Sequence, residues 1–253
     1  MLGRSYNIVL LVIVLCWTST ASAFPISYSK SGSYAYAYTE EDAWYNYNDD
    51  EEWMDSDSLN AYAWAEVSCA DSMAECYDGI FGTYLYAEAN AAQPGTYGLE
   101  GYASAISDTG AFLEFTANFP QIRVQFDYNL MADADWEYGT RYSKAEVGSY
   151  LLDITENYKV WEINFTIVMD GTPLPEPIRY GTVDELLDLA NGHYYRLYLA
   201  VWEVNAYVEG EVTAYASATI ENIQVDGVPL PSTLLLLGAG LLTLAAYERR
   251  NRK

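Results

Sequence analysis

The sequence predicts an all-β fold, a single antiparallel β-sandwich of the jelly-roll type with one short helix. Tyrosine contributes 25 of the 253 residues, and aromatic side chains are enriched in β-strands. Several stretches alternate rings or polar groups with small residues, which places the two sets on opposite faces of a pleated strand. A parallel sheet would require crossover helices between its strands, and the sequence lacks them.

The strand candidates are recognised by this alternation and by the turn residues between them. Strict alternation occurs at 34–38, 61–67, 84–89 and 214–220, and longer candidates follow at 112–119, 122–131, 145–154, 159–169, 194–208 and 212–225. Turn chemistry at 108–110 and 170–173 separates several of them. We therefore expect roughly eight to ten strands in one sandwich.

One short helix is expected from Thr182 onward. The segment Thr182-Val183-Asp184-Glu185 has the form of a capping box, with Thr182 as the N-cap and Glu185 at the third helical position. The apolar positions that would share one helical face are Val183, Leu186, Leu187 and Ala190, and Gly192 would end the helix. We expect this helix to cover one end of the sandwich.

The charge of the chain is strongly acidic. There are 36 Asp and Glu residues against 12 Lys and Arg, which gives a net charge of −24. The stretch 31–122 contains no Lys, Arg or His at all. A chain of this sign repels phosphate backbones, so nucleic-acid binding is excluded as a function.

Residues 1–23 have the features of a secretory signal peptide. One positive charge precedes the apolar run 8–17, and small residues at Ala21 and Ala23 form the pattern that signal peptidase accepts. The new N-terminus would then be Phe24, after export by the secretion machinery. The alternative is a retained membrane anchor, for which the apolar run is short.

The C-terminal residues 228–253 have three parts. The motif Val228-Pro229-Leu230-Pro231-Ser232-Thr233 comes first, an apolar segment follows, and four of the last five residues are basic. A helix over 232–247 would span ~24 Å, close to the ~30 Å of a bilayer core, and the basic tail 248–253 would stay on the cytoplasmic side. The alternative is a buried core helix.

This tripartite tail resembles the PEP-CTERM sorting signal of Gram-negative bacteria that make exopolysaccharide. The usual Pro-Glu-Pro is Pro229-Leu230-Pro231 in this chain, so the glutamate is missing. The resemblance implies recognition of the motif, from Val228 to Ser232, by the membrane protease called exosortase. It also implies transient anchoring by the helix, and delivery to the outer surface or the extracellular matrix. Residues 24–231 would then carry a net charge of −28, from 7 basic and 35 acidic residues.

Two cysteines, Cys69 and Cys76, remain after removal of the signal peptide, in a region expected to be the loop after the strand 61–67. In an oxidising compartment we expect them to form a disulfide that stabilises the fold by ~2 kcal/mol. A zinc site is not expected, because His193 is the single histidine and zinc prefers three or four soft ligands.

Acidic residues provide candidates for Ca²⁺ binding. Nine acids lie between residues 40 and 57, and carboxylates at every other position occur again near residue 135. The candidate ligands are Asp55, Asp57, Asp133, Asp135 and Glu137. The alternative, which we favour, is a solvated loop or strand face that keeps the protein soluble.

Aromatic rows are the candidates for carbohydrate binding, because sugar rings stack on flat aromatic faces. Tyr34, Tyr36 and Tyr38 would share one strand face, and Tyr62 and Trp64 would share another. The alternative is that these rings fill the core of the sandwich.

We therefore expect a non-enzymatic protein of the cell surface or exopolysaccharide matrix that engages polysaccharide or another envelope protein. A secreted glycosidase or lyase, a Ca²⁺-dependent adhesin and a structural filler of the matrix are the alternatives. Catalysis has little support, since a Ser-His-Asp triad would have to use His193 and a pair of carboxylates could occur anywhere in so acidic a chain.

Overall fold

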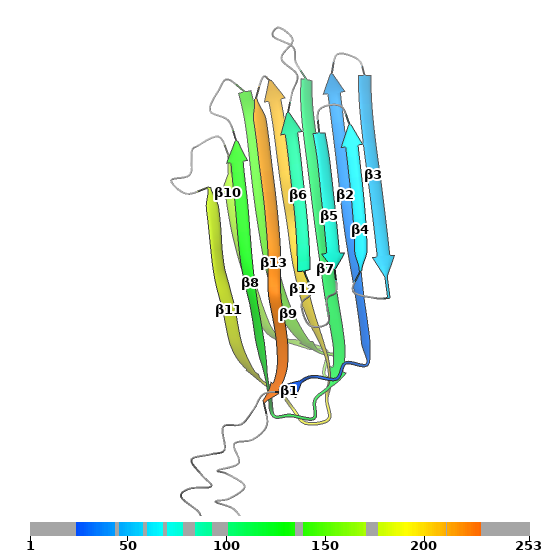
Figure 1. The fold of residues 1–253 in the computed structure, drawn as a ribbon, viewed down its shortest axis with the longest axis vertical. Coiled ribbons are helices and arrows are strands. Elements are labelled where there is room, and N and C mark those ends of the chain that lie inside the picture. The colour runs from blue at the N-terminus through cyan, green and yellow to red at the C-terminus, as the bar shows by residue number, and fades with distance from the viewer. Residues whose placement is uncertain are drawn as a thin grey trace, which may run out of the picture.

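The computed structural model describes residues 24–43, 46–57, 60–67, 70–77, 84–92, 101–134, 139–170, 177–210 and 212–228. Their strands form two antiparallel sheets that lie face to face (Figure 1). We name the sheet that contains the last strand sheet A and the other sheet B. The prediction of an all-β, antiparallel, two-layered fold is thus confirmed.

Sheet A has seven strands, six of which follow one another across the sheet. Their order is β11 (Ile178–Asp188), β8 (Gln121–Ala134), β13 (Thr213–Val228), β6 (Tyr84–Ala92), β5 (Ala70–Tyr77) and β4 (Ala61–Val67). The two-residue strand β1 (Phe24–Pro25) pairs with the end of β13.

Sheet B has six strands. Their order is β10 (Tyr158–Met169), β9 (Gly139–Asp153), β12 (Tyr194–Gly210), β7 (Gly101–Thr116), β2 (Lys30–Ala43) and β3 (Asn46–Ser56). The chain passes between the sheets repeatedly, so neighbours in a sheet are often distant in sequence.

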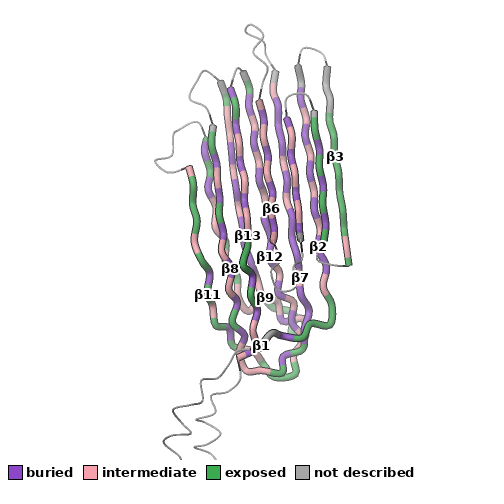
Figure 2. Tube along the Cα trace, viewed as in Figure 1, coloured by how far each residue is buried: buried purple, intermediate pink, exposed green. Residues whose placement is uncertain are grey.

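The core lies between the sheets and is filled by alternate residues of most strands. Figure 2 shows this alternation as purple segments along the strands. Large apolar side chains such as Phe115, Phe126 and Tyr195 fill one part of it. Small side chains fill the part of the core that is lined by β2, β4, β5, β6 and β7. The fully buried residues in this part include Ala35, Ala37, Ala63, Ala65, Ala74, Ala87, Ala89, Ala103 and Ala105.

The alanine-lined part brings the two sheets unusually close together. Cα atoms of β2 and β5 approach within 8 Å, whereas packed sheets are typically ~10 Å apart. Buried serines then bridge the sheets directly, since Ser72 Oγ donates to the Tyr38 carbonyl at 3.2 Å and Ser107 Oγ to the Glu88 carbonyl at 2.8 Å. Small side chains thus fix both the spacing and the polar contacts of this half of the core.

The strands expected from alternation are all present, and three segments besides the predicted helix differ from the predicted elements. The residues around Cys76, expected in a loop, form β5, and the acidic segment, for which the sequence allows a solvated loop or a strand face, forms β3. Residues 108–110, expected to form a turn, lie inside β7. A glycine inside a strand can mark close approach of another group to the backbone, and rings do approach Gly110.

The predicted helix from Thr182 is wrong, because these residues form β11 and no described residue is helical. Val183 and Leu187 are four positions apart, a spacing that satisfies both the helical and the strand period. Pairing with β8 decides between them, since Val183 lies opposite Phe126 and Leu187 opposite Ile122. Thr182 does not cap a helix; its Oγ1 donates to Asp127 Oδ1 at 2.6 Å across the sheet.

Phe24, the predicted new N-terminus, pairs with Gly227 of β13, and Pro25 pairs with Asp226. The point where the signal peptide would be removed and the point where the sorting motif begins therefore lie at the same end of the sandwich. The signal peptide 1–23 and the helix 232–247 lie outside the described residues. Within the described ranges, no helix is long and apolar enough to cross a bilayer.

Candidate functional site

The outer face of sheet B carries a cluster of aromatic side chains that we call the aromatic face. Alternation places it there, because Ala35 and Ala37 point into the core with no exposed surface while the tyrosines between them point outward. The aromatic face consists of Trp53 of β3, Tyr34 and Tyr36 of β2, Tyr198 and Trp202 of β12, and Tyr150 of β9.

The rings of the aromatic face contact one another in two groups. In the first group, Trp53 stacks on Tyr34 with 5.5 Å between centroids and lies 5.8 Å from the Tyr36 ring. In the second group, Tyr198 lies 5.1 Å from Tyr150 and 5.3 Å from Trp202, and all three planes are within 29° of each other. The hydroxyl groups of Tyr34 and Tyr198 are hydrogen bonded and join the groups.

Small residues form the floor between these rings. Gly110 of β7, Ala200 of β12 and Gly148 of β9 lie side by side in the strand register. A Cβ at Gly110 would lie 2.6 Å from the Tyr34 ring, and one at Gly148 would collide with Asn164 Oδ1 and Trp202 Nε1. The absence of a Cβ at these glycines therefore allows the rings to pack directly against the backbone of the sheet. The Trp202 indole N–H donates to Asn164 Oδ1 at 3.2 Å.

Asp108 lies at the edge of this floor, on β7 opposite Tyr36. Burial raises the pKa of its carboxyl group to about 6, although a hydrogen bond with Tyr34 acts in the opposite direction. Its Oδ1 atom is buried and accepts no hydrogen bond from a described residue. Burial, and next the charge of Asp108, also raise the pKa of Tyr34 far above its ordinary value, so this hydroxyl stays protonated.

The cations that flank the aromatic face are occupied by carboxylates. Lys144 contacts Glu146 and Glu203, each at 2.7 Å, and Lys159 contacts Glu162 at 2.7 Å. Arg196 Nε donates to Glu114 Oε1 at 2.8 Å. The charge around Trp53 and Tyr34 is more strongly negative, because residues 31–122, which include these parts of β2, β3 and β7, contain no Lys, Arg or His.

The structure places the predicted aromatic rows outside the core. Tyr34, Tyr36 and Tyr38 share the outer face of sheet B, and the Tyr38 hydroxyl donates to Glu40 Oε2 at 2.8 Å. Tyr62 and Trp64 are 43% and 39% exposed on the outer face of sheet A. The two predicted rows therefore lie on opposite sides of the sandwich and cannot form one site.

Several residues of the aromatic face are not apparent from the sequence. Tyr150, Tyr198 and Trp202 lie in predicted strands, but only strand pairing brings them beside β2. Trp53 lies in an acidic segment without alternating apolar residues, and its 60% exposure follows from its position on an edge strand. The Tyr-x-x-x-Trp spacing of 198–202 is the signal that could have suggested a second aromatic group.

Cys76 is buried on β5 opposite Ala61, and not in a loop. Its predicted partner Cys69 lies outside the described residues, so the disulfide stays a prediction.

The Ca²⁺ candidates are scattered in the structure. Asp55 lies at the end of β3, Asp57 follows it, and both are exposed. Asp133 is exposed near the end of β8, whereas Asp135 and Glu137 lie outside the described residues. In the part of the chain that the structure covers, no three His, Cys, Asp or Glu side chains are placed to hold a metal ion.

His193 makes a structural contact at the end of the sandwich. Its Nδ1 lies 2.7 Å from Oδ2 of the buried Asp153, whose Oδ1 also accepts the Glu156 backbone N–H at 3.1 Å. Burial acts to raise the pKa of Asp153, but these hydrogen bonds outweigh it and lower the pKa. The pair thus holds the β9–β10 turn against the start of β12.

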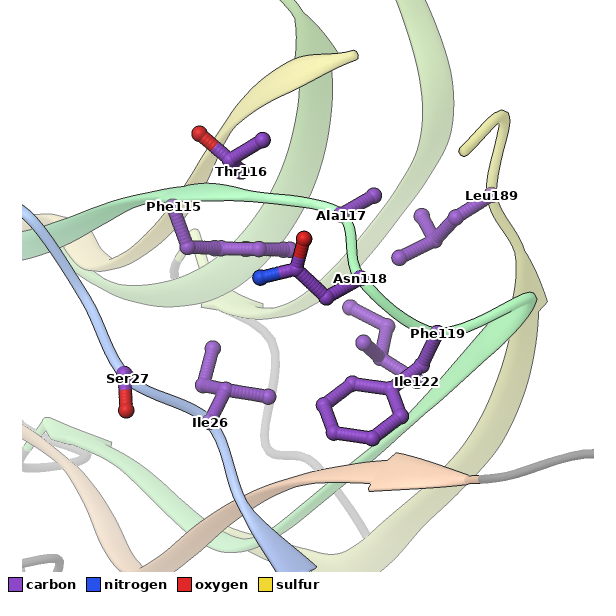
Figure 3. A pocket seen from close by; sticks show the side chains of 9 residues that line it. All are labelled: Ile26, Ser27, Phe115, Thr116, Ala117, Asn118, Phe119, Ile122 and Leu189. Atoms are coloured by element: carbon purple, nitrogen blue, oxygen red, sulfur yellow. The ribbon is translucent and has the colours of Figure 1, made fainter. Parts of the chain in front are cut away.

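A small cavity of about 140 Å³ opens at this end of the sandwich, where β1 and β7 meet the segment before β8 (Figure 3). Its lining is mostly apolar and contains no titratable side chain; the residues are Ile26, Ser27, Phe115, Thr116, Ala117, Asn118, Phe119, Ile122 and Leu189. The cavity offers no group for chemistry, and the aromatic face is the stronger candidate site.

Comparison with known families assigns the C-terminal region. Residues 227–250 match the family model of the PEP-CTERM protein-sorting motif. The chain therefore carries a PEP-CTERM sorting motif, which confirms the identification made from the tail. The motif implies export and processing by an exosortase, and it begins at Gly227 and Val228, the last residues of β13.

Three solved structures resemble parts of the chain. A carbohydrate-binding module specific for non-crystalline cellulose, CBM28, is 9% identical, with 61% of this chain and 80% of that chain covered and a TM-score of 0.25. TmCBM61 in complex with β-1,4-galactotriose is 12% identical, with coverage of 63% and 89% and a TM-score of 0.22.

The third structure is the enzymatically active domain of bacteriophage CBA120 tailspike protein 4, which is 12% identical over 64% of this chain, with a TM-score of 0.22. This chain spans about a fifth (20%) of the length of that domain. No curated protein sequence matches the chain. Similarity at these TM-scores does not extend to a shared site or ligand.

Proposed function

We propose that this is an exported, non-enzymatic protein of the outer surface or exopolysaccharide matrix, sorted by an exosortase-type system, whose aromatic face binds polysaccharide. The sorting motif at residues 227–250 supports export and sorting by an exosortase-type system. The net charge of −28 over residues 24–231 supports solubility in a hydrated matrix that contains cations.

The aromatic face is the observation that supports polysaccharide binding. Sugar rings present C–H groups on their flat sides, and these pack on the electron-rich faces of aromatic rings. Two ring groups joined through Tyr34 and Tyr198 extend from β3 to β9, across five strands of sheet B. An extended chain of sugars, laid across the strands, would meet both groups at once.

Polar groups close to the rings can bind sugar hydroxyls. Asn164 and Glu162 of β10 are exposed beside the second ring group, and Asp108 lies beside the first. A small number of polar groups among apolar contacts is the usual composition of a binding site, in which stacking supplies contact area and hydrogen bonds supply orientation.

Binding of the mature protein to the exopolysaccharide of its own cells tests this proposal. Trp53→Ala removes an exposed ring of the aromatic face, and Trp64→Ala removes an exposed ring of the opposite sheet as the matched control. We expect the first change to weaken binding by about tenfold and the second to leave it unchanged. Equal effects, or none, would show that the aromatic face is not the binding site.

The absence of enzymatic activity and the processing by an exosortase have separate tests. Incubation of the protein with the polysaccharide should release no new reducing ends, and their release would establish the enzymatic alternative. The mass of the surface protein should correspond to a chain without residues 1–23 and without the basic tail 248–253. An intact tail on all surface protein would contradict exosortase processing.

A further inference from the structure

We propose that the aromatic face takes a polysaccharide with free amino groups, so that a protonated amine of the ligand lies between Asp108 and the rings of Tyr34, Tyr36 and Trp53. This inference rests on the proposed polysaccharide function and names the class of sugar that the site selects.

Asp108 has one carboxylate oxygen without a hydrogen-bond partner among the described residues. The residue is half-buried on the outer face of sheet B, and this oxygen, Oδ1, is itself buried. A buried acceptor without a donor costs free energy, and a ligand cation that approaches the exposed part of this half-buried residue can lower that cost through its charge. Glu203 of the neighbouring strand adds further negative charge at this position.

Few cations lie on the described strands that neighbour Asp108. Asp108 is flanked by β2 on one side and by β12 on the other. Residues 31–122 supply β3, β7 and all of β2 except its first residue, and they contain no Lys, Arg or His. On β12 and β9, Arg196 and Lys144 are already paired with Glu114, Glu146 and Glu203.

The aromatic rings beside Asp108 favour a cation at this position. An ammonium group is attracted to the face of an aromatic ring, and the effect is largest for tryptophan. Trp53 stacks on Tyr34, and Tyr34 is hydrogen bonded to Asp108, so ring faces and carboxylate adjoin one another. Glu51, which is hydrogen bonded to Tyr36, adds a second carboxylate nearby.

The same arrangement opposes other charged polysaccharides. A uronic acid, sulfate or phosphate group at this position would face Asp108, Glu51 and Asp55, while residues 31–122, which supply β3, β7 and nearly all of β2, contain no Lys, Arg or His to compensate. Like charges at short distance raise the free energy of the complex. A free amine therefore distinguishes the preferred ligand from both acidic and fully acetylated sugars.

The test compares the exopolysaccharide of the protein's own cells before and after chemical acetylation of its amino groups, at neutral pH. We expect acetylation to weaken binding of the mature protein by about tenfold, the loss that follows from removal of one charge-assisted hydrogen bond. Glucosamine oligomers should compete for the site, and N-acetylglucosamine oligomers of the same length should compete about tenfold less well.

Two variants separate a specific contact from general attraction to an acidic protein. Asp108→Asn removes the proposed partner, and Glu209→Gln removes an equal charge at the exposed far end of β12. We expect only Asp108→Asn to abolish the difference between native and acetylated polysaccharide. Equal effects of the two variants, or native binding that acetylation does not change, would overturn the amine proposal while polysaccharide binding stands. Absence of binding to either polysaccharide would overturn both.

Discussion

Glu52 Oε2 accepts a hydrogen bond from the backbone N–H of Trp64 at 2.6 Å, and this contact joins the edge of sheet B to the edge of sheet A. Two further contacts of the same kind flank it. Asp50 Oδ2 accepts the N–H of Glu66 at 3.0 Å, and Met54 Sδ accepts that of Tyr62 at 3.3 Å. Alternate side chains of β3 thus occupy the N–H groups of an edge strand that would otherwise be open to pairing with another chain.

The first prediction concerns this edge. Replacing Asp50 and Glu52 by Ala should free two N–H groups of β4, lower the free energy of unfolding by about 1–2 kcal/mol and increase aggregation. Asp49→Ala is the control, because Asp49 is an exposed acid on the other face of the same strand. Denaturant unfolding and light scattering measure both effects. Equal behaviour of the variants would mean that charge alone, and not edge protection, keeps the protein soluble.

The second prediction concerns the glycine floor of the aromatic face. Gly148→Ala should displace Trp202 and Asn164, and weaken polysaccharide binding while lowering stability by about 1–3 kcal/mol. Gly181→Ala is the matched control, since its Cβ would meet the Tyr128 hydroxyl at 2.7 Å in sheet A. Similar losses of stability with a loss of binding only at Gly148 would support the site. Equal losses of binding would assign the effect to general destabilisation.

The third prediction compares two arginine–carboxylate pairs. Glu114 is 5% exposed and accepts hydrogen bonds from Arg196 and from the Tyr194 hydroxyl at 2.5 Å, whereas Arg123 and Asp184 are both exposed. Arg196→Met leaves a buried carboxylate without its cation and should cost about 2 kcal/mol or more. Arg123→Met should cost about 0–1 kcal/mol. Chemical unfolding of the two variants measures the difference, and comparable costs would contradict this view of Glu114.

The fourth prediction concerns pH. Because burial raises the pKa of Asp108 to about 6, the folded state retains its proton at a pH where the unfolded state, with a pKa near ~3.9, has lost it. The contribution of Asp108 to stability is therefore full below pH ~4 and falls as the pH rises through ~6. Asp108→Asn should remove this dependence and, at neutral pH, stabilise the protein by about 1–2 kcal/mol after allowance for solvent screening.

Thermal unfolding of the parent protein and of Asp108→Asn across this pH range measures the effect. The difference between the two stability curves should grow with pH and then level off above pH ~6. Parallel curves would show that Asp108 titrates at its ordinary pKa. Groups whose pKa is lowered, such as Asp153, act in both proteins and cancel in the difference.

Much of the fold could be predicted from the sequence because alternation is a local signal. Along β2, β4, β6 and the first half of β13, small or apolar residues alternate with rings or polar residues, and every second position is buried as expected. The signal failed where local patterns were ambiguous. Val183 and Leu187 fit either period. The segment of β3 shows no alternation of polar and apolar residues, because its inward acids contact the edge strand β4 and not the core.

The sequence by itself determined the all-β class, the acidic surface and the sorting motif, since each depends on residues that are adjacent in the chain. The tertiary structure decided which face of each strand is buried, because tyrosine and alanine faces can both be packed and only the close approach of the two sheets selects alanine. It also decided the candidate site. Trp53, Tyr34, Asp108 and Tyr198 come from four strands, and only strand order brings them together.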